Sequence, residues 1–444
     1  MTPERKLFGT DGVRGQAGTF LTAELATALG RAAVQSLDVE RPQVLIVRDT
    51  RESGPMLESA LAAGIAAAGG DALLGGVLPT PAAAILVRRL GLDLAAVVSA
   101  SHNPYGDNGI KFFSREGTKL DDATEARMES LLGSDSTPES IPASGSPGHV
   151  RELNGGLEDY LRALESAFDL DLSGTTIALD CANGATYRAA PAIFERLGAT
   201  VEPIAVEPDG RNINDGCGST HLDCLTEHLA SSEATIGFAF DGDGDRVLAV
   251  DGSGRAFDGD ELIALIAVGR KARGELDGGG VAVTVMSNYG FHRAMEDAGI
   301  DVAVADVGDR YVLEELRRRG WALGGEQSGH IIDMGFAATG DGIAAALMTM
   351  RELDGRDLAK AEPMEKLPQT LVNVEVADRN AIAGAKAVWE AVEGEGAQLE
   401  GRGRVLLRPS GTEPLVRVMV EAPSVGEADE ICGRLATLVK RELG

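Results

Sequence analysis

The sequence predicts an α/β protein of several domains, and two observations support this. Short runs of branched apolar residues alternate with amphipathic helical stretches, and each run ends in a polar turn. The chain of 444 residues is also too long for one hydrophobic core, which favours three or four domains. Because the apolar runs are short and continuous, we expect strands that are buried on both faces of a parallel or mixed sheet.

The expected strands share this pattern over the first two thirds of the chain. They are residues 44–47, 94–98, 176–179, 236–240, 247–250 and 281–285. Helical patterns follow, for example over 55–69 and 260–271. In α/β folds the functional loops lie at the carboxyl ends of such strands, so the polar residues after each run are the first candidates for a site.

Breaks in composition divide the chain further. A linker rich in Ser, Pro and Gly runs from 133 to 148, a Gly-containing turn covers 251–254, and prolines mark 362–368. The remaining C-terminal piece is small, and its pattern indicates an α+β domain. The expected domains are 1–150, 151–253, 254–367 and 368–444.

The charge and cysteine content exclude several classes of protein. A net charge of −28 argues against nucleic acid or an anionic membrane as partner. No apolar run reaches membrane-spanning length and the N-terminus has no signal-peptide pattern, so we expect a cytoplasmic protein. None of the four cysteines forms a C-x-x-C pair, and Cys217, His221 and Cys224 lack the ligands to complete a zinc site.

Ser101 lies in the most informative stretch, Ala100-Ser-His-Asn-Pro104, directly after an expected buried strand. A serine between a strand and an Asn-Pro turn is held in a fixed direction. Taken alone, such a serine would only satisfy the turn. Three other motifs point instead to a serine that carries a phosphoryl group.

The first of these motifs is an aspartate triplet, Asp241, Asp243 and Asp245, with glycines between its members. Glycines let the backbone turn tightly, so that three carboxylates can converge, and hard oxygen ligands suit Mg²⁺. An EF-hand calcium loop is excluded, because Arg246 and Gly252 stand where that loop requires Gly and Glu. An acidic surface turn is the alternative, but like charges this close repel unless a cation joins them.

The second motif is a Ser/Gly/Thr turn between arginines. Backbone N–H groups and hydroxyls in such a turn form an anion nest, and arginine adds bidentate recognition of phosphate. The nucleotide P-loop pattern is absent. The candidate phosphate ligands are Arg408, Ser410, Gly411, Thr412 and Arg417.

The third motif places Glu326, Ser328 and His330 on a glycine-lined loop, where a carboxylate and a hydroxyl suit adjacent sugar hydroxyls. Alone, it would equally fit an ordinary surface loop. Two further cations accompany the motifs. Arg14 lies on a turn from which it could reach a phosphate, and Lys111 could return toward Ser101 across a hairpin or be a solvated strand lysine.

In their order and over nearly the whole length, the motifs A-S-H-N-P, D-G-D-G-D-R, G-E-x-S-G-H and R-P-S-G-T-E-P resemble the α-D-phosphohexomutase superfamily. The segments 8–15, 212–221, 307–312 and 326–330 resemble the branch that acts on glucosamine phosphates. The resemblance implies four domains around a central cleft: three similar mixed-sheet α/β domains and a smaller α+β C-terminal domain. It implies interconversion of glucosamine 6-phosphate and glucosamine 1-phosphate for UDP-N-acetylglucosamine synthesis.

The resemblance also implies a role for each motif. Ser101 would rest as phosphoserine, with one Mg²⁺ bridging it to the three aspartates, and a hexosamine 1,6-bisphosphate would be the intermediate. Arg246 and Arg14 would offset charge, while His102 and Lys111 are both candidates for proton transfer. A small sugar phosphate is the expected partner, and a homodimer is compatible with this description. Three alternatives are a mannose or glucose phosphate mutase on the same scaffold, a sugar-phosphate phosphatase and a non-catalytic sensor.

Overall fold

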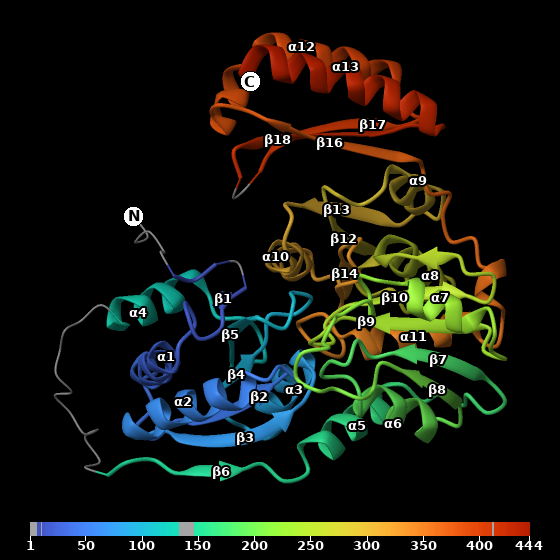
Figure 1. Cartoon of the computed structure of the whole chain (residues 1–444). Coiled ribbons are helices and arrows are strands. Elements are labelled where there is room, and N and C mark those ends of the chain that lie inside the picture. Colours follow the sequence, from blue (N-terminus) through green and yellow to red (C-terminus); the bar gives the residue numbers. More distant parts are fainter. Residues whose placement is uncertain (1–6, 10, 133–145, 411–412) are drawn as a thin grey trace. The chain divides into compact units, whose positions relative to one another are not determined.

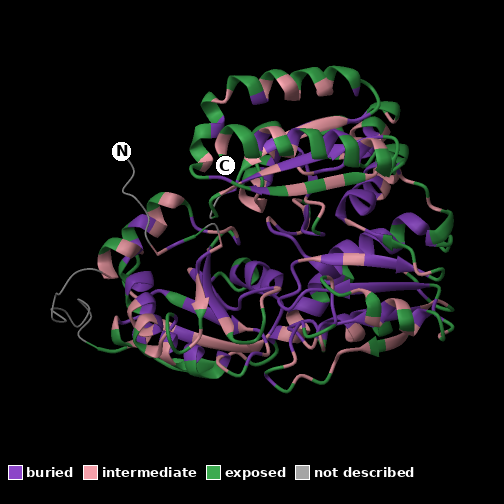
Figure 2. Cartoon of the chain, turned by 45° about the horizontal axis from the view of Figure 1, so that its top comes forward, coloured by how far each residue is buried: buried purple, intermediate pink, exposed green. Residues whose placement is uncertain are grey.

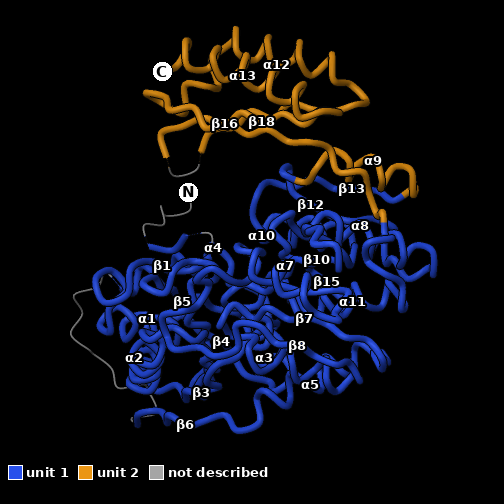
Figure 3. The backbone as a smooth tube through the Cα atoms, turned by 45° about the vertical axis from the view of Figure 1, so that its right-hand side comes forward, with its two compact units in different colours: residues 1–286, 300–361 blue, residues 287–299, 362–444 orange. Residues whose placement is uncertain are grey.

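A computed structural model of the chain describes residues 7–9, 11–132, 146–410 and 413–444 (Figure 1). By its internal contacts the chain forms two compact units, which Figure 3 colours separately. The first unit consists of residues 1–286 and 300–361, and the second of residues 287–299 and 362–444.

The first sheet has six strands in the order β1-β5-β4-β2-β3-β6. Strands β4, β2, β3 and β6 run parallel, whereas β5 is antiparallel to both β4 and β1. Helix α3 packs against β2, β4 and β5, while α1, α2 and α4 share one hydrophobic cluster with the sheet. The elements are β1 (Val13–Gln16), α1 (Ala23–Gln35), β2 (Gln43–Arg48), α2 (Gly54–Ala67), β3 (Asp71–Val77), α3 (Thr80–Arg89), β4 (Leu94–Val98), β5 (Asp107–Ser114), α4 (Asp122–Leu132) and β6 (Val150–Glu152).

The second sheet has five strands in the order β11-β10-β9-β7-β8. Strands β9, β7 and β8 are parallel, and β10 returns antiparallel to β9. Its elements are α5 (Gly156–Ala167), β7 (Thr176–Asp180), α6 (Ala189–Arg196), β8 (Thr200–Ile204), α7 (Asp223–Leu229), β9 (Ile236–Phe240), β10 (Val247–Asp251) and β11 (Ala256–Phe257).

The third sheet has four strands in the order β13-β12-β14-β15. Again three strands are parallel, and the last, β15, returns antiparallel to β14. Its elements are α8 (Gly259–Arg273), β12 (Gly280–Thr284), β13 (Asp301–Ala305), α10 (Asp309–Arg319), β14 (Leu323–Gly325), β15 (Ile331–Asp333) and α11 (Gly342–Leu353). Short 3₁₀ turns cover Asp277–Gly279 and Leu358–Lys360.

The three sheets therefore repeat one plan. Each has a set of parallel strands, four in the first sheet and three in the other two, and an antiparallel return strand: β5 after β4, β10 after β9, and β15 after β14. In each sheet one motif occupies the turn before the return strand. These motifs are residues 100–104 (the serine motif), the aspartate triplet, and residues 325–330 (the sugar-loop motif). Because parallel strands end at one edge of a sheet, the repeated plan fixes where each motif is displayed.

The second unit contains a three-stranded antiparallel sheet in the order β16-β18-β17, with α12 and α13 on one face (Figure 1). Helix α9 also belongs to this unit, because buried Glu421 accepts hydrogen bonds from the Tyr289 backbone N–H at 2.8 Å and from Asn288 Nδ2 at 3.4 Å. The elements are α9 (Tyr289–Asp297), β16 (Gln369–Glu375), a 3₁₀ turn (Arg379–Gly384), α12 (Lys386–Gln398), β17 (Arg404–Pro409), β18 (Leu415–Glu421) and α13 (Val425–Leu443).

Burial follows the predicted pattern, since the strands at the centre of the sheets are largely buried (Figure 2). Every residue of β4 and β9 is buried, as expected for strands covered on both faces. The predicted fold class is therefore confirmed: three mixed-sheet α/β domains and a smaller α+β C-terminal domain. Over the described parts of the chain, no helix is long and apolar enough to cross a membrane. Most of the predicted linker, residues 133–145, lies outside the described residues.

Candidate active site

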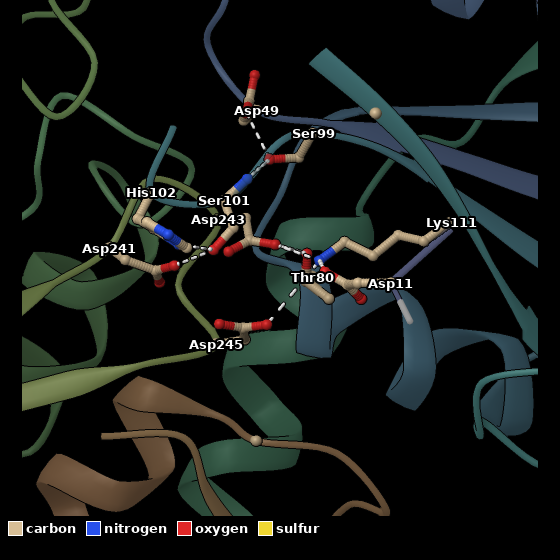
Figure 4. Close-up of polar contacts among 12 residues, drawn as sticks. Asp11, Asp49, Thr80, Ser99, Ser101, His102, Lys111, Asp241, Asp243 and Asp245 are labelled. Carbon is tan, nitrogen blue, oxygen red and sulfur yellow. Dashed lines mark hydrogen bonds and ion pairs between the residues drawn. The ribbon is translucent and has the colours of Figure 1, made fainter. Parts of the chain in front are cut away.

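Ser101 lies in the turn after β4, and its side chain points at the aspartate triplet (Figure 4). Its Oγ donates a hydrogen bond to Asp241 Oδ2 at 2.5 Å, and His102 Nδ1 lies 3.4 Å from the same Oγ. Only 1% of Ser101 is exposed, and its backbone has φ +54°, in the left-handed region that non-glycine residues rarely adopt. The hydroxyl is therefore held in a fixed, sparsely populated geometry.

The aspartate triplet fills the tight turn between β9 and β10, in which Gly244 takes φ +73°. All three carboxylates are buried, and one oxygen from each lies within 4.8 Å of the others. Within the described chain, Oδ1 of Asp243 and Oδ1 of Asp245 are buried without a hydrogen-bond partner. Converging hard oxygens with unused lone pairs fit a divalent cation such as Mg²⁺. Among the described residues this is the one such group, so Cys217, His221 and Cys224 do not form another.

The pKa values of the triplet are shifted because the three carboxylates are buried close together. Burial, and then the charges of Asp243 and Asp245, raise the pKa of Asp241 well above its usual value. Burial would raise the pKa of Asp243 too, but the charge and hydrogen bond of Lys111 hold it well below the usual range. Thr80 adds a further donor, with Oγ1 at 2.7 Å from Asp243 Oδ2. The pKa of Asp241 is thus raised, whereas that of Asp243 is lowered, because of these two only Asp243 is paired directly with Lys111.

Lys111 lies on β5 opposite Val97 of β4, so the hairpin brings it back beneath the serine turn. It is 2% exposed, and its Nζ lies 2.6 Å from Asp243 Oδ2, 3.6 Å from Asp11 Oδ2 and 3.9 Å from Asp245 Oδ2. Asp11 in turn pairs with Arg14, and its Oδ1 lies 2.5 Å from Lys119 Nζ. Lys111 is therefore a buried ion-paired lysine and not a solvated one.

His102 lies between Ser101 and Arg246. Arg246 Nη1 is 3.2 Å from His102 Nδ1, and since a guanidinium only donates, Nδ1 must accept. Burial, followed by the charges of Arg246 and Arg14, lowers the pKa of His102. A nitrogen that accepts from a guanidinium carries no proton, and this same Nδ1 lies 3.4 Å from Ser101 Oγ.

The sugar-loop motif occupies the turn between β14 and β15. Ser328 is exposed and Glu326 half-buried, with Glu326 Oε1 accepting a hydrogen bond from the Gly308 N–H at 3.1 Å. His330 is buried instead, with Nε2 accepting from the Gly340 N–H at 3.0 Å and Nδ1 3.6 Å from Asp245 Oδ2. His330 thus faces an aspartate of the triplet.

The phosphate motif lies in the second unit, on the β17–β18 hairpin. Arg408 and Arg417 stand directly opposite each other, an arrangement of like charges that destabilises a strand pair unless an anion joins them. Burial, and then the charge of Arg417, lowers the pKa of Arg408. Buried Ser410 accepts a hydrogen bond from the Glu413 N–H at 3.3 Å. The other two expected ligands, Gly411 and Thr412, lie outside the described residues.

The structure thus gathers Ser101, His102, Lys111, Arg14, Arg246, the triplet and His330 in the first unit, while the phosphate motif belongs to the second. Sequence reasoning missed Asp11, Thr80, Arg51 and Asn214. One signal could have found Arg51, because Arg48-Asp49-Thr50-Arg51 follows a buried strand as the recognised motifs do. Asn214 lies in a segment noted only for its resemblance to one branch of the superfamily.

Comparison with known proteins identifies the family. Models of the phosphoglucomutase/phosphomannomutase domains match in order: α/β/α domain I over 5–139, domain II over 158–254, domain III over 258–371 and the C-terminal domain over 371–438. The chain therefore belongs to the phosphoglucomutase/phosphomannomutase family and is an isomerase of the mutase type.

Its curated relatives are more specific. The phosphoglucosamine mutase of Pelotomaculum thermopropionicum is 50% identical over 439 residues, which cover 98% of this chain and 99% of that protein. The phosphoglucosamine mutase of Mycolicibacterium vanbaalenii is 50% identical over 444 residues, with the same coverage. The resemblance to the glucosamine phosphate branch is confirmed by these matches.

Solved structures show the same fold at low identity. A phosphoglucomutase/phosphomannomutase family protein from Burkholderia thailandensis has a TM-score of 0.82 at 24% identity, covering 98% of this chain and 97% of that one. An N-acetylphosphoglucosamine mutase from Aspergillus fumigatus, solved with GlcNAc-6P and magnesium, has a TM-score of 0.69 at 19% identity, covering 100% and 97%.

Proposed function

We propose that this enzyme interconverts glucosamine 6-phosphate and glucosamine 1-phosphate, with Ser101 as the phosphoryl carrier. The observation that carries the proposal is the 2.5 Å contact between Ser101 Oγ and Asp241 Oδ2, because it sets a strained, buried hydroxyl directly against a carboxylate triplet. The choice of an amino sugar is supported by relatives about 50% identical over nearly the whole chain, which are phosphoglucosamine mutases.

One divalent cation, Mg²⁺, would be held by the phosphorylated Ser101 and by Asp241, Asp243 and Asp245. Bound there, the ion would neutralise charge on the transferring phosphoryl group. The two buried oxygens without partners, Oδ1 of Asp243 and Oδ1 of Asp245, support this assignment.

The reaction consists of two phosphoryl transfers. The C1 hydroxyl of glucosamine 6-phosphate attacks the phosphorus on Ser101, the bond from phosphorus to Ser101 Oγ breaks, the hydroxyl proton ends on Ser101 Oγ, and glucosamine 1,6-bisphosphate forms. After the bisphosphate turns over, Ser101 Oγ attacks the phosphorus at position 6, the bond from phosphorus to O6 breaks, the serine proton ends on O6, and glucosamine 1-phosphate leaves. Such transfers depend mainly on alignment and charge stabilisation, which a rigid serine turn and buried cations supply.

His102 and Lys111 would then have different tasks. Neutral His102 has an accepting nitrogen 3.4 Å from Ser101 Oγ, so it would take the hydroxyl proton in the second transfer. Lys111 is held in ion pairs with Asp243 and its neighbours, so it would contribute fixed positive charge. Arg246 and Arg14 would add to that charge.

The remaining motifs would bind the substrate. Glu326 and Ser328, on the half-exposed β14–β15 turn, would hold sugar hydroxyls. His330 would orient Asp245, which it faces at 3.6 Å. The far phosphate would be bound by Arg408, Ser410, Gly411, Thr412 and Arg417. The two opposed arginines on β17 and β18, of which Arg417 has only the carboxylate of Glu413 at 3.7 Å as a counter-charge, support an anion there.

Ser101→Ala tests the proposal, with Ser130→Ala, at an exposed serine of α4, as a matched control. We expect Ser101→Ala to abolish isomerisation, whereas Ser130→Ala should match the wild type. The purified wild type should carry an added mass of about 80 Da on Ser101, found by intact-mass analysis and peptide mapping.

Substrate choice is tested by kcat/KM for glucosamine 6-phosphate against glucose 6-phosphate. A preference for glucose 6-phosphate would reject the amino-sugar assignment, and near-normal activity of Ser101→Ala would reject the phosphoenzyme. Steady release of inorganic phosphate without isomerisation would identify a phosphatase instead.

A further inference from the structure

Two side chains from different sheets converge on the backbone of the serine turn, which we define as residues 101–107. Arg51 follows β2, and its Nη2 donates to the carbonyl oxygens of Ser101 at 2.9 Å and Asn103 at 2.8 Å. Asn214 comes from the loop between β8 and α7, and its Nδ2 donates to the same two oxygens at 3.0 and 3.2 Å. The carbonyl oxygen of Ser101, the proposed nucleophile, thus accepts hydrogen bonds from both Arg51 and Asn214.

Arg51 is fully buried, and every N–H of its guanidinium has a partner. Nε donates to Asp49 Oδ2 at 2.8 Å, Nη2 to the two carbonyls above, and Nη1 to the carbonyls of Asp107 at 2.9 Å and of Pro104. Five donors in a rigid planar fork are available only from arginine. Four of the five N–H donors of Arg51 bind carbonyl oxygens of the serine turn, so this buried arginine fixes the backbone conformation of the turn.

The other end of Ser101 is tied to the same ion pair. Asp49 Oδ2, which receives Arg51 Nε, also accepts a hydrogen bond from Ser99 Oγ at 2.5 Å, and Ser99 Oγ accepts one from the Ser101 N–H at 3.1 Å. Both backbone groups of Ser101 are therefore fixed by one buried network. Because a serine at φ +54° is strained, it keeps this conformation only where its surroundings impose it.

Asn214 adds the link to the aspartate triplet. It also adopts a left-handed backbone, with φ +58°, and its amide lies against Gly242, between two members of the triplet. A Cβ at Gly242 would come within 2.6 Å of the Ser101 carbonyl oxygen and 2.8 Å of Asn214 Nδ2. The serine turn, Asn214 and the aspartate turn are thus packed so closely that the amide sets their spacing.

We infer that Arg51 and Asn214 are positioning residues. They hold Ser101 at the position relative to the aspartate triplet that phosphoryl transfer requires. The inference rests on the proposed function, because it concerns the serine that carries the phosphoryl group. Neither side chain touches the hydroxyl, so each acts through the turn. A displacement of about 1 Å of a reacting group can cost roughly 100-fold in rate.

Asn214→Gly isolates the role of the amide, since glycine adopts φ +58° without strain. Asn183→Gly is the matched control, because Asn183 is likewise left-handed at φ +48° but its side chain does not contact the serine turn. We expect Asn214→Gly to lower kcat by about 10- to 100-fold. KM for glucosamine 6-phosphate and the thermal unfolding midpoint should stay close to those of Asn183→Gly.

Arg51→Lys provides an independent second variant, because lysine has at most three donors in place of five. Its control is Arg211→Lys, an exposed arginine paired with Glu52. We expect Arg51→Lys to lower kcat and to slow phosphorylation of Ser101 by glucose 1,6-bisphosphate, followed by intact mass. If Arg51→Lys does not fold, the comparison of Asn214→Gly with Asn183→Gly still decides the question.

A kcat of Asn214→Gly within about twofold of that of Asn183→Gly would overturn the inference. A lower kcat accompanied by a clearly lower unfolding midpoint than that of Asn183→Gly would overturn it as well. The wild type, assayed in parallel, separates this outcome from failure of the proposed function. An inactive wild type would reject the function itself, whereas an active wild type beside an unaffected Asn214→Gly would reject only the positioning role.

Discussion

Lys111 shows how much of this site depends on buried charge. It lies among carboxylates of Asp11, Asp243 and Asp245, and almost none of it reaches solvent. Burying a charge is unfavourable unless a partner compensates it, and removing one partner leaves the other exposed to that cost. When no metal is bound, the positive charge of Lys111 therefore offsets the cost of burying these carboxylates together.

Lys111→Met should accordingly destabilise the metal-free enzyme by about 3–5 kcal/mol. Mg²⁺ should recover part of this loss, because the ion supplies the missing positive charge. Lys386→Met, at an exposed lysine of α12 paired with Glu390, is the control and should have little effect. Denaturant unfolding with and without Mg²⁺ measures both. Equal stability of Lys111→Met and Lys386→Met would contradict this view of the cluster.

At this scale the sequence indicated candidates for chemistry, but it did not indicate the residues that hold those candidates in place. Ser101 and the three aspartates lie in motifs whose residue types state their chemistry. Arg51 and Asn214 act on backbone carbonyl oxygens, which every residue offers, so no pattern of side chains records the contact. His330 was expected to bind sugar from its loop, and only the fold shows that it faces Asp245.

Among the elements, α11 begins at an unusual cap. Asp341 accepts a hydrogen bond from the Ala344 N–H at 3.0 Å, as an N-cap does, and also from Tyr160 Oη of α5 at 2.9 Å. Both side chains are buried. Burial raises the pKa of Asp341 from 3.8 to about 6, although the hydrogen bonds from Ala344 and Tyr160 oppose it.

This shift gives the fold a pH dependence with a definite sign. Because the folded pKa lies above the unfolded one, folded Asp341 keeps its proton between pH 4 and 6 when the unfolded chain has lost it. Its contribution to stability is thus present below pH 4 and is lost as the pH rises through 6, a change of roughly 3 kcal/mol.

Asp341→Asn cannot titrate, so its unfolding free energy should lack this decline. The gap between Asp341→Asn and wild type should therefore move in favour of the variant by roughly 2 kcal/mol from pH 4 to pH 7. Asp357→Asn, an exposed aspartate that caps a 3₁₀ turn, is the control. A gap for Asp341→Asn that does not change with pH would show that folding does not raise the pKa of Asp341.

The elements themselves were largely predictable. Each expected strand is observed with ends shifted by no more than a residue or so, because continuous apolar runs between polar turns leave few alternatives. The shared plan of the three sheets was beyond the sequence. It rests on which strands pair and in which direction, and side-chain patterns do not specify pairing between distant segments.

For the whole molecule, the division by contacts differs from the division by family. Helix α9 falls within the match to domain III, yet its contacts group it with the C-terminal sheet. The buried carboxylate of Glu421 contributes to this grouping, since it accepts hydrogen bonds from the start of α9 and from Arg404 Nε at 2.7 Å. Asn288 contributes as well, through two hydrogen bonds of 3.0 Å with the backbone of Leu367. A composition break could not reveal this, because the grouping depends on hydrogen bonds between distant segments, such as that between Tyr289 and Glu421, which lie 132 residues apart.

Single-turnover transfer from phosphorylated Ser101 tests the central claim most directly. Enzyme labelled with ³²P on Ser101 is mixed with glucosamine 6-phosphate and Mg²⁺, and the label is followed on the millisecond to second scale. We predict that the label leaves the protein and is found first in glucosamine 1,6-bisphosphate, at a rate no slower than kcat. Label that remains on the protein while product accumulates, or that passes directly to inorganic phosphate, would contradict the account.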